Sequence, residues 1–189
     1  MTMPPGQTAT AFHGLSLLAR GPLVDVALAV RQAAQEGADQ PILVFDDETG
    51  RVIDLDLRGD AEALMARYAG DTPAPRGRGR PRLGVTAREV TLLPRQWDWL
   101  ATQPGGASAT LRRLVDQARR ADAGQTETRT RRDAAYRAMS ALAGDLPGFE
   151  EASRALFGGE PALFAARIGH WPADLRAYLL RLLDAPPAG

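Results

Sequence analysis

The sequence predicts an α+β protein with a small N-terminal domain of element order ββαββα, a central strand–helix–helix unit and a C-terminal helical segment. Three observations carry this prediction. Short β-prone runs surround one amphipathic helix in residues 1–70, a basic segment rich in Gly and Pro follows at 71–87, and apolar residues recur at helical spacing over 130–185. The strand–helix–helix unit occupies residues 88–122 between these last two segments.

The N-terminal domain begins with two β-like runs, Thr8–His13 and Leu15–Arg20, which flank Gly14 as a hairpin would. Pro22 suits the first turn of a helix. Apolar residues then recur at helical spacing until Gly37, which predicts where this helix ends.

The rest of this domain alternates in the same way. Ile42–Phe45 has the pattern of a buried strand, and residues 46–50 are rich in turn formers. Val52–Leu57 alternates apolar and acidic residues, which predicts a fourth strand. Asp60 can cap a short helix that reaches Tyr68.

In the central unit, Arg88–Leu93 predicts a strand and Pro94 begins a helix. Pro104–Gly106 breaks that helix, and Ser108 is expected to cap a second one. Four further helices follow, the last running from Pro172 to Leu183. We expect this helical tail to pack on the central unit or to mediate assembly.

Charge is unevenly distributed along a chain whose formal total is zero. Residues 1–71 hold five Arg against eleven acids (−6), residues 72–132 thirteen against five (+8), and residues 133–189 five against seven (−2). A basic segment within a neutral chain favours a polyanionic partner. Neither cysteine, nor a signal peptide, nor an apolar run of membrane-spanning length occurs, so the expected location is the cytoplasm.

The basic segment contains Arg-Gly-Arg-Pro, which resembles the core of an AT-hook. In that motif the Arg-Gly-Arg tripeptide lies extended in the minor groove of A·T-rich DNA. A side chain in place of Gly would strike the floor of the groove. The resemblance implies a DNA-binding arm formed by Arg76, Arg78, Gly79, Arg80, Pro81 and Arg82.

The strand–helix–helix order of residues 88–122 resembles a ribbon-helix-helix domain, and Leu93-Pro94 matches the end of the family's strand. The resemblance implies a homodimer whose paired strands enter the major groove of double-stranded DNA. It also implies that a phosphate binds at Ser108 and the amides of Ala109 and Thr110. The family register would direct Arg88, Val90 and Leu92 at DNA, whereas a slip by one residue would present Glu89 and Thr91.

Two alternatives for this unit remain open. It can be a helix-turn-helix whose recognition helix, Ser108–Arg120, presents Thr110, Arg112 and Arg113 to bases, or an ordinary helical hairpin. Taken together, the candidate DNA-binding residues outside the arm are Arg88, Thr91, Arg95, Ser108, Thr110, Arg112 and Arg113.

Nearly the whole chain resembles an uncharacterised bacterial family called domain of unknown function 2239. The resemblance rests on the segments Thr10–Gly14, Val44–Gly50, Gly79–Gly84, Arg88–Leu100, Pro104–Ser108 and Ala143–Glu151. The family implies no activity.

We therefore expect a DNA-binding protein without cofactor, metal or catalytic residues, either a transcriptional regulator or a nucleoid-associated factor. The acidic residues around 46–56 match no calcium loop and indicate a solvated turn, and His13 and His170 lie in no metal-ligand spacing. The alternative is a protein-interaction or adaptor module whose basic centre docks on an acidic protein surface. No effector follows from the sequence.

Overall fold

A computed structural model describes residues 7–68, 88–122 and 124–184. The chain divides into two compact units, of which the first combines Met1–Ala74 with Glu127–Gly189 and the second is Pro75–Thr126. The first unit is therefore built from both ends of the sequence and the second from its middle. The chain is mixed α+β, as predicted.

A three-stranded antiparallel sheet of order β2-β1-β3 forms the middle of the first unit. Strands β1 (Thr8–His13) and β2 (Ser16–Pro22) pair as the predicted hairpin, and β1 also pairs with β3 (Ile42–Asp46). Helix α1 (Leu23–Gln35) follows β2 directly and ends where Gly37 takes the left-handed φ of 84°. In helix α2 (Ala61–Tyr68), the Ala63 amide donates to the Asp60 carboxylate at 2.8 Å, which confirms the predicted cap.

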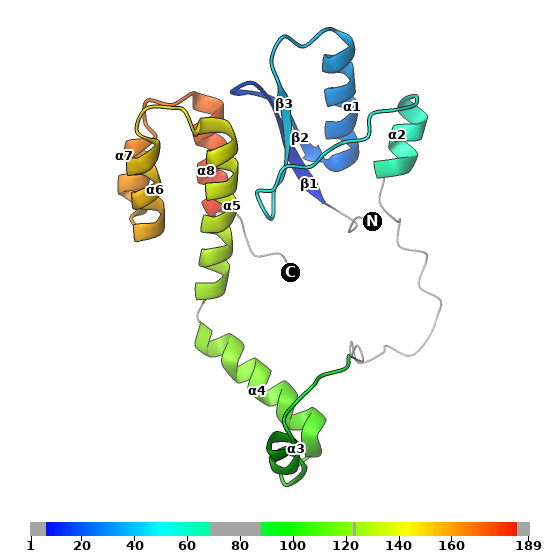
Figure 1. Cartoon of the computed structure of the whole chain (residues 1–189), viewed down its shortest axis with the longest axis vertical. Helices are drawn as coiled ribbons and strands as arrows, with labels where there is room; N and C mark the ends of the chain where they lie inside the picture. Colours follow the sequence, from blue (N-terminus) through cyan, green and yellow to red (C-terminus); the bar gives the residue numbers. More distant parts are fainter. Residues whose placement is uncertain (1–6, 69–87, 123, 185–189) are drawn as a thin grey trace. The chain divides into compact units, whose positions relative to one another are not determined.

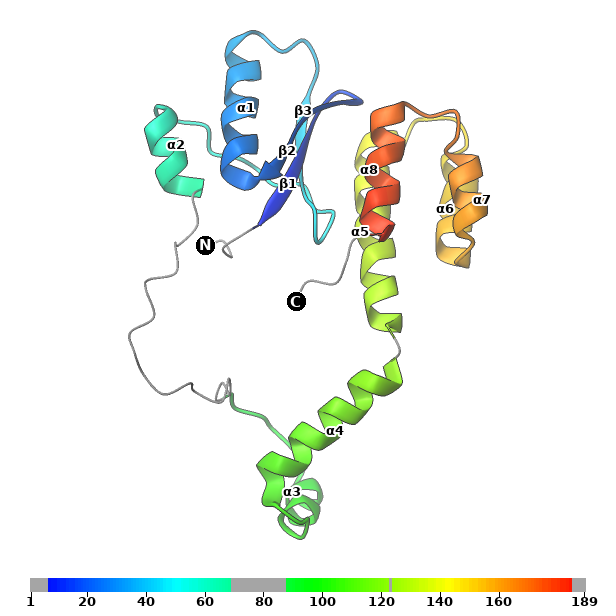
Figure 2. The same ribbon diagram turned by 180° about the vertical axis from the view of Figure 1, so that it is seen from behind.

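The sheet has two apolar faces because alternate side chains point to opposite sides. On one face, Ala9, Ala11 and Val44 pack with apolar residues of α1. On the other face, Phe12 and Phe45 join a larger core with the C-terminal helices. Figure 2 shows the sheet between α1 and the pair α5 and α8.

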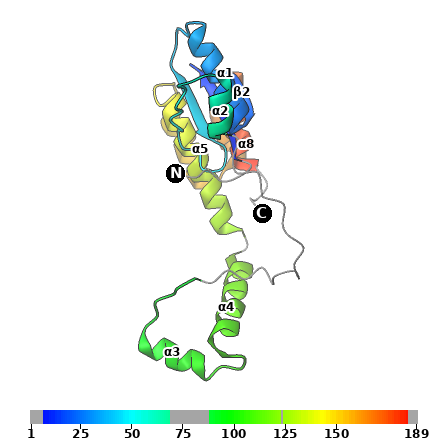
Figure 3. The same cartoon turned by 90° about the vertical axis from the view of Figure 1, so that its right-hand side faces the viewer.

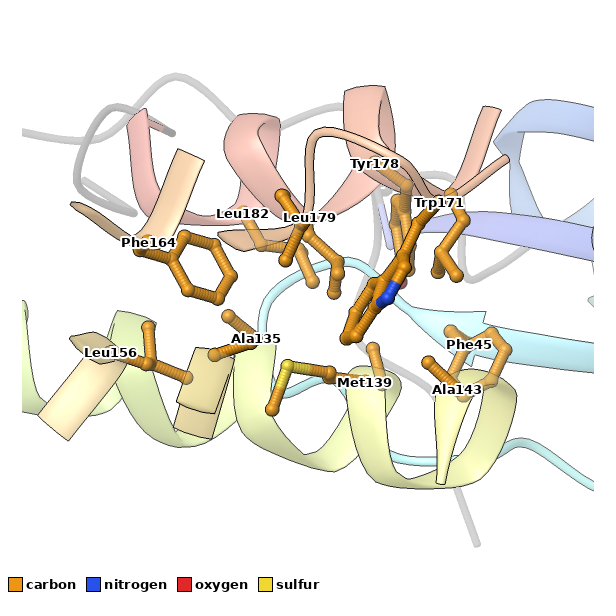
Figure 4. Close-up of a cluster of buried hydrophobic side chains, with 14 of the residues drawn as sticks. Phe45, Ala135, Met139, Ala143, Leu156, Phe164, Trp171, Tyr178, Leu179 and Leu182 are labelled. Carbon is orange, nitrogen blue, oxygen red and sulfur yellow. The ribbon is translucent and has the colours of Figure 1, made fainter. Parts of the chain in front are cut away.

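The C-terminal helices are α5 (Gln125–Ala143), α6 (Phe149–Gly158), α7 (Pro161–Arg167) and α8 (Ala173–Asp184). All four were predicted, but their packing partner was not. They share their core with the N-terminal sheet. Figure 4 shows Met139, Trp171 and Tyr178 in this core with Phe45. Without these helices Phe12 and Phe45 would be exposed to water, which explains why the two ends of the chain associate.

The predicted fourth strand at Val52–Leu57 is wrong. Only Val52 bridges Phe45, and the Ile53 amide donates to the Val44 carbonyl at 2.7 Å before pairing stops. The alternation still has a use, because Ile53, Leu55 and Leu57 pack against the apolar cluster beneath α1. The alternation of apolar residues over Val52–Leu57 therefore indicates which side chains are buried, although this segment forms no hydrogen-bonded strand.

A partly buried polar cluster also joins the two ends of the first unit. Arg181 of α8 donates to the Thr10 hydroxyl at 2.8 Å and lies 3.3 Å from the Asp47 carboxylate, which in turn accepts from Thr10 at 2.7 Å. The same guanidinium lies 5.2 Å from the centre of the Tyr178 ring. Burial, followed by the charge of Asp47, raises the pKa of the Tyr178 hydroxyl, so that this group stays protonated.

Gly50 offers a direct test of this association. A Cβ at Gly50 would lie 2.0 Å from the Ala134 carbonyl oxygen of α5, and Gly50 has a φ of 65°. Gly37 has a similar φ of 84° but no atom within 4 Å of its Cβ position. We expect Gly37→Ala to lower the free energy of unfolding by about 1–2 kcal/mol for its backbone conformation alone. Gly50→Ala should cost about 1–3 kcal/mol more because of the clash. Urea unfolding followed by circular dichroism measures both, and equal losses would contradict the packing of this turn on α5.

Candidate nucleic-acid interface

The second unit contains a helical hairpin whose local structure follows from its sequence. Helix α3 (Pro94–Ala101) begins at Pro94, and the Leu93 amide donates to the Gln96 side chain at 2.9 Å. Gly105 and Gly106 then take φ values of 81° and 75°, which reverse the chain into α4 (Gly106–Asp122). Figure 3 shows α3 beside the first part of α4 only.

Residues 88–93 do not form the predicted strand. In this single chain they have no regular secondary structure, and the backbone at Leu93 is extended, with φ −66° and ψ 147°. A ribbon strand pairs with a second copy rather than within its own chain, so a lone chain provides no ladder for it. The ribbon-helix-helix arrangement is therefore unconfirmed.

The hairpin buries little. Its only buried side chains among residues 88–122 are Leu100 and Thr110, which are 3% and 1% exposed. Six large apolar side chains of the same stretch remain exposed by 39–55%, namely Val90, Leu93, Trp97, Trp99, Leu114 and Val115. On α4, Leu114 and Val115 continue the apolar stripe at helical spacing and are exposed. Exposed apolar side chains in such number on a small unit are typical of interaction surfaces.

The opposite side of α4 is basic. At 100° per residue, Arg112, Arg113, Arg119 and Arg120 fall within about a third of the helix circumference, together with Asp116. We call these four arginines the basic face of α4. All four are exposed, and none forms an ion pair with a residue that the structure describes. Arg112 donates to the Ser108 hydroxyl at 3.0 Å.

Among the other predicted site residues, Arg88, Thr91 and Arg95 are exposed. The expectations for Ser108 and Thr110 need correction. Helix α4 begins at Gly106, so Ser108 lies within its first turn and does not cap it, and the free amides belong to Ala107 and Ser108 rather than Ala109 and Thr110. The Thr110 side chain is buried in the hairpin and cannot reach a base.

The predicted arm falls outside the described residues. Its members are Arg76, Arg78, Gly79, Arg80, Pro81 and Arg82. The same holds for the basic linker around them, so its role stays a prediction.

Among the acidic residues around 46–56, Asp46 and Asp56 form local bonds. Asp46 accepts from the Thr49 amide at 2.6 Å, and the Arg58 side chain and amide hold the pKa of Asp56 below its usual range. Asp47 binds Arg181 instead of facing solvent, which no local sequence signal could reveal because the two are 134 positions apart. In the described part of the chain, no group of three or more acidic residues or histidines is placed to hold a metal ion. No described helix is long and apolar enough to cross a bilayer.

Comparison with known proteins assigns the chain to a family. A family model described as "Uncharacterized protein conserved in bacteria (DUF2239)" matches residues 8–183. The chain therefore belongs to this bacterial family. No curated protein and no solved structure matches it.

Burial of Thr110 leads to a stability prediction. Its hydroxyl has no hydrogen-bond partner in the structure, whereas the exposed Thr102 hydroxyl donates to the Trp99 carbonyl at 2.8 Å. We expect Thr110→Val to leave the hairpin as stable or to stabilise it by up to about 1 kcal/mol, because it removes an unpaired buried polar group. The matched change Thr102→Val should destabilise it by about 0.5–1.5 kcal/mol. Amide exchange in α4, followed by NMR, reports both, and weaker protection in Thr110→Val would show that this hydroxyl has a partner.

Proposed function

We propose that this member of the uncharacterised bacterial family binds double-stranded DNA as a homodimer through its second unit, as a transcriptional regulator or a nucleoid-associated factor. The observation that supports this most is the basic face of α4. Four exposed arginines without ion-pair partners among the described residues lie opposite an apolar stripe on the same helix. Apolar contacts to a second copy would leave this face free for a polyanion.

Electrostatics favours phosphate as the ligand of this face. Residues 88–122 hold six Arg and four acids, a net charge of +2, and the arm at 76–82 adds four Arg. The guanidinium group binds phosphate oxygens through paired hydrogen bonds, and bound phosphates release counterions. In the proposed complex the arm follows the minor groove, as its AT-hook resemblance implies.

The small core of the hairpin supports the homodimer. Leu100 and Thr110 alone cannot stabilise a 35-residue stretch in isolation, and burial of Val90, Leu93, Leu114 and Val115 against a second copy would supply the missing apolar contact. We propose that residues 88–93 of the two copies pair in the same interface. Their extended backbone at Leu93 and the exposure of Arg88 and Thr91 are compatible with a ribbon.

The basic face predicts a salt-dependent loss. We expect the fourfold change of Arg112, Arg113, Arg119 and Arg120 to Gln to weaken binding to a duplex at least about tenfold. The slope of log affinity against log salt should fall by about 2–4, because each lost phosphate contact removes about 0.9 from it. Gln retains most of the helix propensity of Arg, so α4 should stay helical. Fluorescence anisotropy with a labelled duplex over a range of salt concentrations measures this.

The control removes as many charges from the first unit. The fourfold change of Arg20, Arg51, Arg154 and Arg167 to Gln affects exposed residues only and should leave the slope unchanged. Equal slopes for the two variants would show that the basic face does not hold DNA. Absence of duplex binding by the unaltered protein at low salt would instead favour the adaptor function, in which the basic centre docks on an acidic protein.

The dimer predicts a change of mass. We expect Leu114→Glu with Val115→Glu to convert a dimer to a monomer, since two carboxylates would have to be buried in the interface. The control, Val52→Glu with Met65→Glu, alters two apolar side chains of the first unit that are 52% and 44% exposed and should stay dimeric. Sedimentation velocity distinguishes the two, and a monomeric unaltered protein at micromolar concentration would contradict the proposal.

A further inference from the structure

A pocket of about 250 Å³ lies at one end of the C-terminal helices, within the first unit. Its apolar lining includes Leu156 of α6, Phe164 of α7 and Leu183 of α8. Figure 4 shows Leu156 and Phe164 at the end of the buried cluster, where they face each other below α8. The pocket is smaller than the 300–1,000 Å³ typical of drug-sized sites, so its ligand would be a small metabolite.

Charged groups of both signs line the same pocket. Arg132 of α5, Glu160 before α7 and Asp184 at the end of α8 all contribute, and none of the three forms an ion pair with a residue that the structure describes. Arg131, by contrast, is paired with Glu127. A Cβ at Gly159 would lie 2.8 Å from Nη2 of Arg132, so the glycine allows the guanidinium to lie against the backbone at the pocket.

We propose that this pocket binds a free α-amino acid with an apolar side chain. The carboxylate of the ligand would pair with Arg132, and its ammonium group with Glu160 or Asp184, as charge-assisted hydrogen bonds. The side chain would lie against Pro161 and Leu183, the apolar lining residues that remain at least partly exposed, above the buried Leu156 and Phe164. A fatty acid would leave the two acidic residues without a partner, and an amine would leave Arg132 without one. Of these three kinds of ligand, only the zwitterion offers an opposite charge both to Arg132 and to an acidic residue of the lining.

This site is independent of the proposed DNA binding. It lies wholly within the first unit, and neither the basic face nor the exposed apolar residues of α4 contribute to it. Its α5 residues, from Thr128 to Arg132, begin two positions after the boundary of the second unit at Thr126.

Titration calorimetry on the full chain tests the proposal, with L-leucine and L-phenylalanine as probes. We expect saturable binding of at least one of them at a single site. Isocaproate, which lacks the ammonium group of leucine, and isoamylamine, which lacks the carboxylate, should each bind at least about tenfold more weakly. Equal binding of either analogue, or no saturable binding of the two amino acids at millimolar concentration, would overturn the proposal.

Two variants locate the site. Arg132→Met should weaken binding of the amino acid about tenfold or more. The control is Arg129→Met, since Arg129 is an exposed residue of the same helix that does not line the pocket. This control variant should bind the amino acid as the unaltered protein does. Glu160→Gln provides an independent second variant at an exposed position. Should Arg132→Met and Glu160→Gln both bind normally, the ligand would lie elsewhere and the assignment would be wrong.

Discussion

The sheet has apolar side chains on both faces, and the architecture follows from the need to cover both. Helix α1 comes directly after the hairpin and covers Ala9, Ala11 and Val44. No helix within the described residues 7–68 covers Phe12 and Phe45. The C-terminal helices supply that contact, although Ala135, their first residue in this core, comes 90 positions after Phe45. Arg181, Asp47 and Thr10 add a polar contact between the same parts, and loss of Arg181 would leave the largely buried Asp47 carboxylate without its counter-charge.

The core of the first unit uses residues from both ends of the sequence, so the middle of the chain must form a separate core. Residues 88–122 bury two side chains and expose six large apolar ones, so the hairpin lacks the core that the first unit has. Natural chains rarely keep such a surface without a partner. Helix α4 carries part of this apolar surface on one side and four exposed arginines on the other. In the proposed dimer the apolar side contacts a second copy and the basic side contacts DNA.

Local patterns in the sequence predicted most of the helices and strands. Pro22, Pro94 and Gly37 mark helix ends because their backbone preferences act locally, and the structure confirms them. The strand predicted at Val52–Leu57 is wrong, because an alternating pattern indicates which side chains are buried and not whether the segment pairs with a neighbouring strand.

The candidate site was less predictable. Serine is common at helix N-termini, which favours Ser108 as a cap, but two glycines with positive φ start the helix two residues earlier. The helical position of Thr110 predicts a contact with DNA, but the structure shows that its side chain is buried in the hairpin. The Asp47–Arg181 pair and the pocket at Arg132 arise from contacts between distant segments, which no local pattern encodes.

In the proposed complex the second unit, and not the first, contacts DNA. Photocrosslinking of the full chain to a bromodeoxyuridine-substituted duplex, followed by peptide mapping, tests it most directly. DNA binding through the second unit should give crosslinks in residues 88–122 and in the arm at 76–82. Crosslinks confined to residues 7–68 and 127–184, or a duplex that crosslinks nowhere, would contradict it.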